Sequence, residues 1–158
     1  MKSTWQEALG KMTYGIYVLT TSVKEEINGM IASWVSQVSY DPPLIMVAIH
    51  PNRYSHHLVR QSGHFALHLL GQNQTDLLGR FKGPDPSAKF TSINWERGET
   101  GCPILQDCLA YIECDVKTII SPGNHTLFIG EVKEAQVFSE LDVPFTSLDY
   151  RGVYQGKD

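Results

Sequence analysis

The sequence predicts a mainly β protein, a small β-barrel with short helices between its strands. About six or seven segments rich in Val, Ile, Tyr, Phe and Thr are separated by turns that contain Gly, Pro and Asn. Residues 109–120 show the clearest pattern, because polar and apolar side chains alternate along them as in a half-buried strand. We find no internal repeat, linker or low-complexity tract, so we predict one domain over residues 1–158.

Local signals predict where the elements begin and end. Thr4 and Glu7 have the spacing of a capping box, and Ser55 can cap a second helix that Gly63 would end. Pro42-Pro43 cannot lie inside a sheet, because proline lacks the N–H that a strand ladder needs. The expected elements are, in order, helix 4–13, strands 15–23 and 30–38 joined as a hairpin by a turn at 24–29, strand 44–49, helix 55–62, strand 64–70, helix 75–81, an irregular excursion over 82–102, and strands 109–120 and 125–138.

The last two expected strands carry predicted core residues. Alternation places Cys114 in the core and Glu113 on the opposite, polar face. In the final strand, Leu127, Ile129 and Val132 are the candidate core positions around an irregularity at a glycine.

Composition excludes several classes of partner. There are 13 basic and 17 acidic residues, a net charge of −4, and no basic stripe of the kind that nucleic acid selects. No apolar run has the length of a membrane span, and the N-terminus lacks the apolar segment of a signal peptide, so we predict a cytoplasmic protein without a membrane partner. Cys102, Cys108 and Cys114 fit neither a disulfide framework nor a Cys-x-x-Cys site and are predicted to be reduced thiols.

Common catalytic and cofactor motifs are absent from the sequence. It contains no Gly-x-Gly-x-x-Gly, no phosphate-binding Gly-x-x-x-x-Gly-Lys-Ser/Thr, no His-Glu-x-x-His and no Gly-x-Ser-x-Gly. His64 and His68 would lie about 13 Å apart along a strand that rises roughly 3.3 Å per residue, too far to share one ion. We therefore predict no metal site.

The most distinctive candidate site combines two short segments. Gly29 precedes small residues whose backbone N–H groups a flat polar ligand could approach, and Asn52, Arg53 and Ser55 follow the next strand, where they could hold a phosphate. Two alternatives remain open on the residues alone: the first segment can be an ordinary hairpin strand with Trp34 as filler, and Arg53 can be a solvated loop residue.

Several short patterns recur in a characteristic order along the chain. They are Asn28-Gly29-Met30-Ile31-Ala32-Ser33-Trp34, Ser39-x-x-Pro42-Pro43, Gly63-x-Phe65-Ala66, Leu78-x-x-Phe81, Lys89-Phe90, Gly101-x-Pro103 and Gly123-Asn124-His125-x-Leu127-Phe128-x-Gly130-Glu131-Val132. Together they resemble the flavin reductase family, and the similarity runs from about Trp5 to Tyr154. The resemblance implies an FMN-binding split β-barrel, with FMN or possibly FAD as cofactor and NAD(P)H as co-substrate.

The resemblance also implies roles for individual residues. The backbone of Met30 to Trp34 would surround the isoalloxazine ring, and His125 would lie beside the incoming nicotinamide, with a turn-capping histidine as the alternative. The full implied set is Gly29, Met30, Ile31, Ala32, Ser33 and Trp34 at the ring, Ala48 and Ile49 beneath it, Asn52, Arg53 and Ser55 near the phosphate, Phe81 and Lys82 beside the ribityl tail, and Tyr150 or Tyr154 closing the pocket. Two departures are Ile31, where the family usually has Thr, and Asn124, where Asp is frequent.

The function that the resemblance implies is hydride transfer from nicotinamide to flavin N5, so that the cofactor supplies the reactivity and the protein supplies alignment. Reduced flavin would serve a monooxygenase or reduce ferric complexes, and two barrels would pair as a homodimer. Two alternatives remain open: an FMN electron carrier of the flavoredoxin type, reduced by a protein partner, and a non-catalytic barrel that binds flavin or haem.

Overall fold

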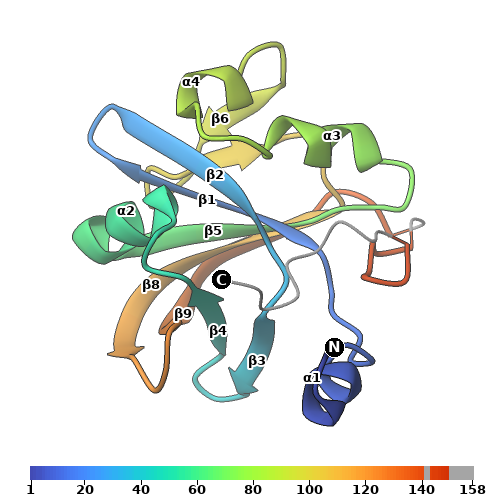
Figure 1. The fold of residues 1–158 in the computed structure, drawn as a ribbon. Coiled ribbons are helices and arrows are strands. Elements are labelled where there is room, and N and C mark those ends of the chain that lie inside the picture. The colour runs from blue at the N-terminus through green and yellow to red at the C-terminus, as the bar shows by residue number, and fades with distance from the viewer. Residues whose placement is uncertain (141–142, 150–158) are drawn as a thin grey trace.

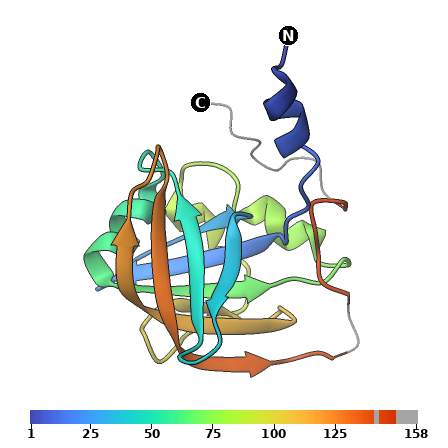
Figure 2. The same cartoon turned by 90° about the horizontal axis from the view of Figure 1, so that it is seen from below.

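An antiparallel sheet of seven strands, curled around a core, forms most of the protein (Figures 1 and 2). The computed structural model describes residues 1–140 and 143–149. The elements are α1 (Thr4–Leu9), β1 (Tyr17–Val23), β2 (Glu26–Ala32), β3 (Val35–Ser39), β4 (Leu44–Ile49), α2 (Tyr54–Ser62), β5 (His64–Leu69), α3 (Thr75–Arg80), α4 (Pro86–Lys89), β6 (Trp95–Arg97), β7 (Pro103–Leu105), β8 (Ala110–Ile120) and β9 (Thr126–Val137). The strand order across the sheet is β2-β1-β5-β8-β9-β4-β3, and β6 pairs with β7 in a separate small sheet. The predicted mainly β fold is confirmed.

The first hairpin has a shorter turn than the sequence predicts. The β1–β2 ladder continues to the pair Val23 and Glu26, so Asn28 and Gly29 lie inside β2 and not in the turn. A Cβ at position 29 would lie 2.6 Å from the ring of Phe81, so only glycine lets that ring pack against the strand. The glycine at position 29 therefore serves packing, not turning.

The predicted single strand over residues 30–38 is in fact two strands. β2 pairs with β1, whereas β3 pairs with β4 at the other edge of the sheet, and Ser33 and Trp34 lie between them. The backbone carbonyl of Trp34 accepts a hydrogen bond of 2.9 Å from the N–H of Ala48 in β4. Both segments have strand-like sequences, so a change of pairing partner between them leaves no periodic signal.

Both predicted helix caps are displaced. Ser3 precedes α1, and its N–H donates to Oε1 of Gln6 over 2.9 Å, so the capping box is formed by this pair and not by Thr4 with Glu7. α2 begins directly after Arg53, and Ser55 is buried inside the helix. The predicted end of α2 at a left-handed Gly63 is confirmed, with φ of 75°.

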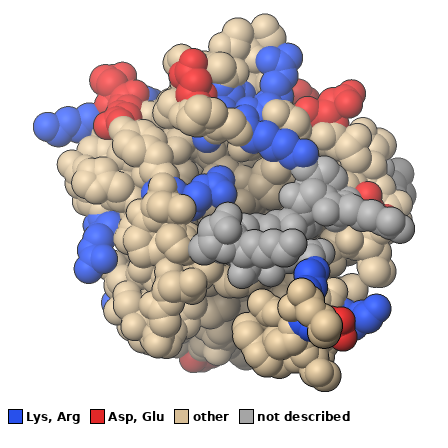
Figure 3. Space-filling view, viewed as in Figure 1, with Lys and Arg blue, Asp and Glu red and all other residues tan. Residues whose placement is uncertain are grey.

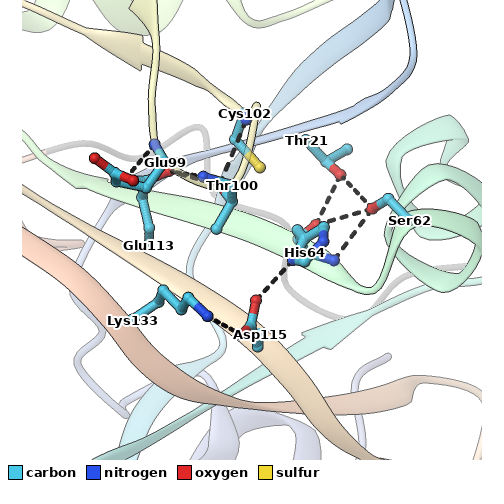
Figure 4. A network of polar contacts seen from close by, with 9 residues as sticks. All are labelled: Thr21, Ser62, His64, Glu99, Thr100, Cys102, Glu113, Asp115 and Lys133. Carbon is cyan, nitrogen blue, oxygen red and sulfur yellow. Dashed lines mark hydrogen bonds and ion pairs between the residues drawn. The ribbon is translucent and has the colours of Figure 1, made fainter.

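The excursion predicted as irregular contains α4, β6 and β7, which are too short to produce a periodic pattern. Glu113 of β8 holds this region against the barrel (Figure 4). The Glu113 carboxylate accepts hydrogen bonds from the N–H of Glu99 (3.2 Å) and from the N–H and Oγ1 of Thr100 (3.0 and 2.6 Å). Glu113 is fully buried, so the face of β8 that the sequence predicts to be polar is covered at this position.

The core prediction is right for Cys114 of β8 and wrong for Leu127 and Ile129 of β9, whereas Val132 of β9 is partly buried and packs against the core as predicted. Cys114 is fully buried, as predicted, and Cys102 and Cys108 are buried, unpaired thiols as well. In β9 the fully buried side chain is Phe128, whereas Leu127 and Ile129 are half-buried. All three are apolar, so alternation alone does not identify the inner face.

No helix among the described residues is both long enough and apolar enough to cross a membrane.

Candidate functional site

Two adjoining cavities open beside β2, the end of β4 and the start of α2. The first, which we call the ring cavity, has a volume of about 130 Å³ and is lined by Met30, Ile31, Ala32, Ser33, Trp34, Ala48, His50, Asn52, Arg53 and His125. The second, the cation cavity, has a volume of about 360 Å³ and is lined by Asn28, Met30, Asn52, Arg53, Tyr54, Ser55, Gly83, Pro84 and Lys89. The two share Met30, Asn52 and Arg53, so one elongated ligand could occupy both.

The wall of the ring cavity forms where β2 leaves the sheet. Met30 and Ala32 are buried in the barrel core, and the side chain of Ile31 packs partly against a second apolar cluster. Beyond Ala32, the β2 ladder ends and the chain crosses to β3 through Ser33 and Trp34. Because the cavity wall follows this backbone, the Ile31 departure leaves backbone contacts with a ligand possible.

Lys89 gives the cation cavity its character. It lies at the end of α4, is 4% exposed, and donates from Nζ to Oδ1 of Asn28 (3.0 Å) and to the carbonyl of Gly29 (2.8 Å). Asn28 in turn donates from Nδ2 to Oγ of Ser55 over 3.1 Å. These bonds connect α4, β2 and α2 around one buried ammonium group.

The cation cavity contains positive charge without a carboxylate. In the described part of the chain, neither Arg53 nor Lys89 forms an ion pair with an acidic side chain. Burial, and then the nearby Arg53, lower the pKa of Lys89 below its ordinary value, and the exposed Asp85 at the N-terminus of α4 only partly opposes them. A buried cation without an ion-paired carboxylate is costly, so the arrangement favours an anionic ligand such as a phosphate. Figure 3 shows Lys and Arg side chains over the upper middle of the face seen in Figure 1, with Asp and Glu mostly toward its margin.

His125 lies directly before β9, close to the rings of Trp34 and His50. Its ring centroid lies 4.6 Å from that of Trp34 and 5.1 Å from that of His50, the latter in an edge-to-face arrangement at 86°. Nδ1 of His125 lies 2.8 Å from Oδ1 of Asn124. An amide oxygen only accepts hydrogen bonds, so Nδ1 carries the proton and Nε2 is the acceptor of the neutral ring. Burial, and then His50, lower the pKa of His125.

The structure brings together most of the predicted site residues. Those that line a cavity are Met30, Ile31, Ala32, Ser33, Trp34, Ala48, Asn52, Arg53, Ser55 and His125. Gly29, Ile49 and Phe81 do not line either cavity, and the fully buried Phe81 packs behind β2 against Gly29. Lys82 is exposed and also lies outside both linings. Tyr150 and Tyr154 are outside the described residues.

Sequence reasoning missed Asn28, His50 and Lys89 as site residues. Asn28 and Lys89 stand in segments that carry the family resemblance, but nothing in the sequence shows that Lys89 is buried beside β2. His50 is separated from His125 by 75 positions, so their contact is a property of the β4–β9 pairing. The described residues contain no group of three His, Cys, Asp or Glu side chains that could hold a metal ion.

Known proteins that are similar to this chain include reductases that act on flavin or ferric chelates. A family model described as the flavin reductase like domain matches residues 9–157. The chain is 32% identical over 155 residues to the ferric-chelate reductase (NAD(P)H) of Archaeoglobus fulgidus, covering 96% of this chain and 91% of that protein. It is 31% identical over 153 residues to HsaB, the reductase subunit of a flavin-dependent monooxygenase of Mycobacterium tuberculosis, covering 97% and 81%. Among solved structures, the NADH:FAD oxidoreductase SgcE6 of Streptomyces globisporus is similar with a TM-score of 0.83 at 26% identity, covering 90% and 86%.

Proposed function

Because the chain belongs to the family of flavin reductase like domains, we propose that it is an NAD(P)H:flavin oxidoreductase that supplies reduced flavin to a second protein. A bound flavin supplies the hydride-accepting chemistry when NAD(P)H is the donor. The observation that carries the proposal is the pairing of the two cavities: one is walled by backbone and rings, and the other holds two cations without a carboxylate partner.

The residues fit a flavin with a phosphate at one end. The wall from Met30 to Trp34, with Ala48 opposite, would hold the ring system, and Ser33 could hydrogen-bond its polar edge. Arg53, Lys89 and Ser55 would hold the phosphate. Since one phosphate dianion balances the two cations, we propose FMN as the cofactor, with FAD as the alternative.

His125 would meet the nicotinamide. It lines the ring cavity, and its Nε2 can accept a hydrogen bond from a carboxamide N–H without a proton leaving either group. Its proposed role is to orient the nicotinamide, because hydride transfer depends on the alignment of the donor and needs no side-chain acid. No carboxylate lines either cavity among the described residues, so acid–base chemistry has no obvious candidate there.

We also propose a homodimer, on the observation that α1 stands apart from the barrel (Figure 2). Its apolar side chains are exposed, with Trp5 at 64% and Leu9 at 52%, and no residue of α1 is buried. A helix of six residues is not stable alone in water, so it needs a surface to pack on. Light scattering of the full chain should give twice 17.7 kDa, and Trp5→Lys should lower this mass toward that of the monomer. A wild-type monomer that binds FMN would contradict the proposed homodimer and leave the proposed flavin site unaffected.

The proposed recipient of the reduced flavin is a flavin-dependent monooxygenase, because the related HsaB is named as the reductase subunit of such an enzyme. A cytoplasmic location is also proposed, since the three cysteines are unpaired and would persist in a reducing compartment.

Titration with FMN, followed by flavin fluorescence, tests the proposed function. We expect saturable binding of one FMN per chain, and oxidation of NADH or NADPH that rises with added flavin. Absence of binding in the micromolar range would contradict the flavin assignment. Tight FMN binding without nicotinamide oxidation would instead support the electron carrier.

A further inference from the structure

His50 lines the ring cavity directly after β4, yet nothing in the sequence marks it as a site residue. Its Nδ1 accepts a hydrogen bond of 3.1 Å from the N–H of Asn52, so in the neutral ring Nε2 carries the proton. This bond holds the imidazole in the turn between β4 and α2. The ring of His50 stands edge-to-face with His125, with their centroids 5.1 Å apart.

The backbone next to His125 is fixed by a contact of the following residue with α2. The next residue, Thr126, is buried, and its Oγ1 lies 2.7 Å from Nε2 of His56 in α2. The backbone at the start of β9 is therefore fixed by α2, and orientation of the His125 ring depends on what touches the ring itself. Asn124, Trp34 and His50 are among the residues that contact the ring.

We propose that His50 is a positioning residue that holds the His125 ring in one orientation and in its neutral form, ready to accept a hydrogen bond from the nicotinamide carboxamide. This inference rests on the proposed function. Asn124 supports it, because its amide oxygen accepts from Nδ1 without the negative charge that would favour an imidazolium.

The surroundings of His125 oppose a second positive charge. Among the described residues that line the ring cavity with His125, the ones that can carry a charge are His50 and Arg53, and neither is acidic; His56 lies beneath Thr126. A protonated His50, whose ring centroid lies 5.1 Å from that of His125, would repel an imidazolium at position 125.

The test uses the full chain loaded with FMN and three variants. His50→Ala removes both the ring contact and the potential charge, His50→Phe keeps an aromatic edge but no charge, and His57→Ala is the control, since His57 is an exposed histidine of α2. The measurements are KM and kcat for NADH, the Kd of FMN, and the pH titration of the His125 ring by NMR.

For His50→Ala we expect KM to rise about fivefold, as loss of one aromatic edge contact would produce, with little change in kcat or in FMN affinity. The His125 resonance should titrate at higher pH in both His50 variants, whereas His50→Phe should keep a KM close to that of wild type. His57→Ala should change neither quantity.

Three results would overturn the inference. One is a His50→Ala variant that matches His57→Ala in KM and in the His125 titration. Another is loss of FMN affinity in His50→Ala with KM unchanged, which would make His50 a flavin ligand. The third is an unshifted His125 resonance in both His50 variants. If wild type does not oxidise NADH, the proposed function fails, while the NMR titration still decides whether His50 controls His125.

Discussion

Glu113 and Lys89 are both buried and charged, but their surroundings differ. Glu113 accepts three hydrogen bonds from the loop at residues 99 and 100, all supplied by the chain itself. Lys89 donates to an amide oxygen and a backbone carbonyl, has Arg53 and the exposed Asp85 nearby, and forms no ion pair among the described residues. The comparison indicates that Glu113 has a structural role, whereas Lys89 is placed to bind an anionic group of a ligand.

Near Glu113, the other acidic side chain of β8 also has partners from the chain itself. In Figure 4, Asp115 of β8 lies between His64 and Lys133, with Nδ1 of His64 at 2.8 Å and Nζ of Lys133 at 3.3 Å. These two partners lower the pKa of the Asp115 carboxyl, against a burial effect that raises it. No comparable acidic residue lines the cation cavity in the described chain.

Removing the structural carboxylate should have the largest effect. Glu113→Ala removes a fully buried acceptor from three partly buried donors, and since a hydrogen bond to a charged group is worth about 1.5–3 kcal/mol, we expect a loss of roughly 4 kcal/mol in the free energy of unfolding. Urea denaturation measures this. Glu134→Ala is the matched control, because Glu134 faces Glu113 across the β8–β9 ladder and is exposed. A loss below about 1 kcal/mol would remove Glu113 from the structural side of the comparison.

A variant of Arg53 tests the ligand-binding role of the cation cavity. Arg53→Ala should weaken FMN by about 10-fold to 150-fold, the equivalent of roughly 1.5–3 kcal/mol for one charge-assisted hydrogen bond. Riboflavin, which lacks the phosphate, should bind almost as it does to wild type. Lys117→Ala is the control, because Lys117 of β8 is an exposed cation outside both cavity linings. Equal weakening of FMN and riboflavin would show that Arg53 does not contact the phosphate.

His68 shows a third way of treating a buried ionisable group, which is to keep it neutral. Its Nδ1 donates to the carbonyl of Val18 and its Nε2 accepts from the N–H of Leu105. Burial lowers the pKa of His68 to about 4, so below the ordinary histidine value near 6.5 the unfolded chain binds a proton that the folded chain does not.

Stability is therefore lost as the pH falls through this window, and we expect His68 to account for roughly 2 kcal/mol between pH 7 and pH 5. Urea denaturation at the two pH values measures the loss, and His57→Gln, at an exposed position, should leave it unchanged. A His68→Gln variant with the same pH dependence as wild type would refute the assignment.

The sequence predicts the parts of this molecule that depend on neighbours along the chain. The strand-rich pattern, the glycine end of α2 and the buried Cys114 follow from local periodicity and turn chemistry. The division between β2 and β3 does not, because both segments are strand-like and only their pairing partners differ.

The site divides in the same way. The contiguous wall from Met30 to Trp34 and the turn with Arg53 could be found from the sequence, since each lies in one short segment. Lys89 could not, because its importance comes from burial against Asn28 and Gly29, about sixty positions earlier in the chain. His50 likewise becomes a site residue only when β4 and β9 pair.

The most direct test of this comparison is the ratio of the Kd for riboflavin to the Kd for FMN, measured by fluorescence titration of wild type and Lys89→Met. If the ligand phosphate compensates Lys89, the ratio should fall by at least about tenfold in the variant, as loss of one charge-assisted bond requires. The free energy of unfolding without flavin should change little, because the variant removes an uncompensated buried charge together with two hydrogen bonds. An unchanged ratio would contradict the account, since Lys89 would then be a structural cation like the structural anion Glu113.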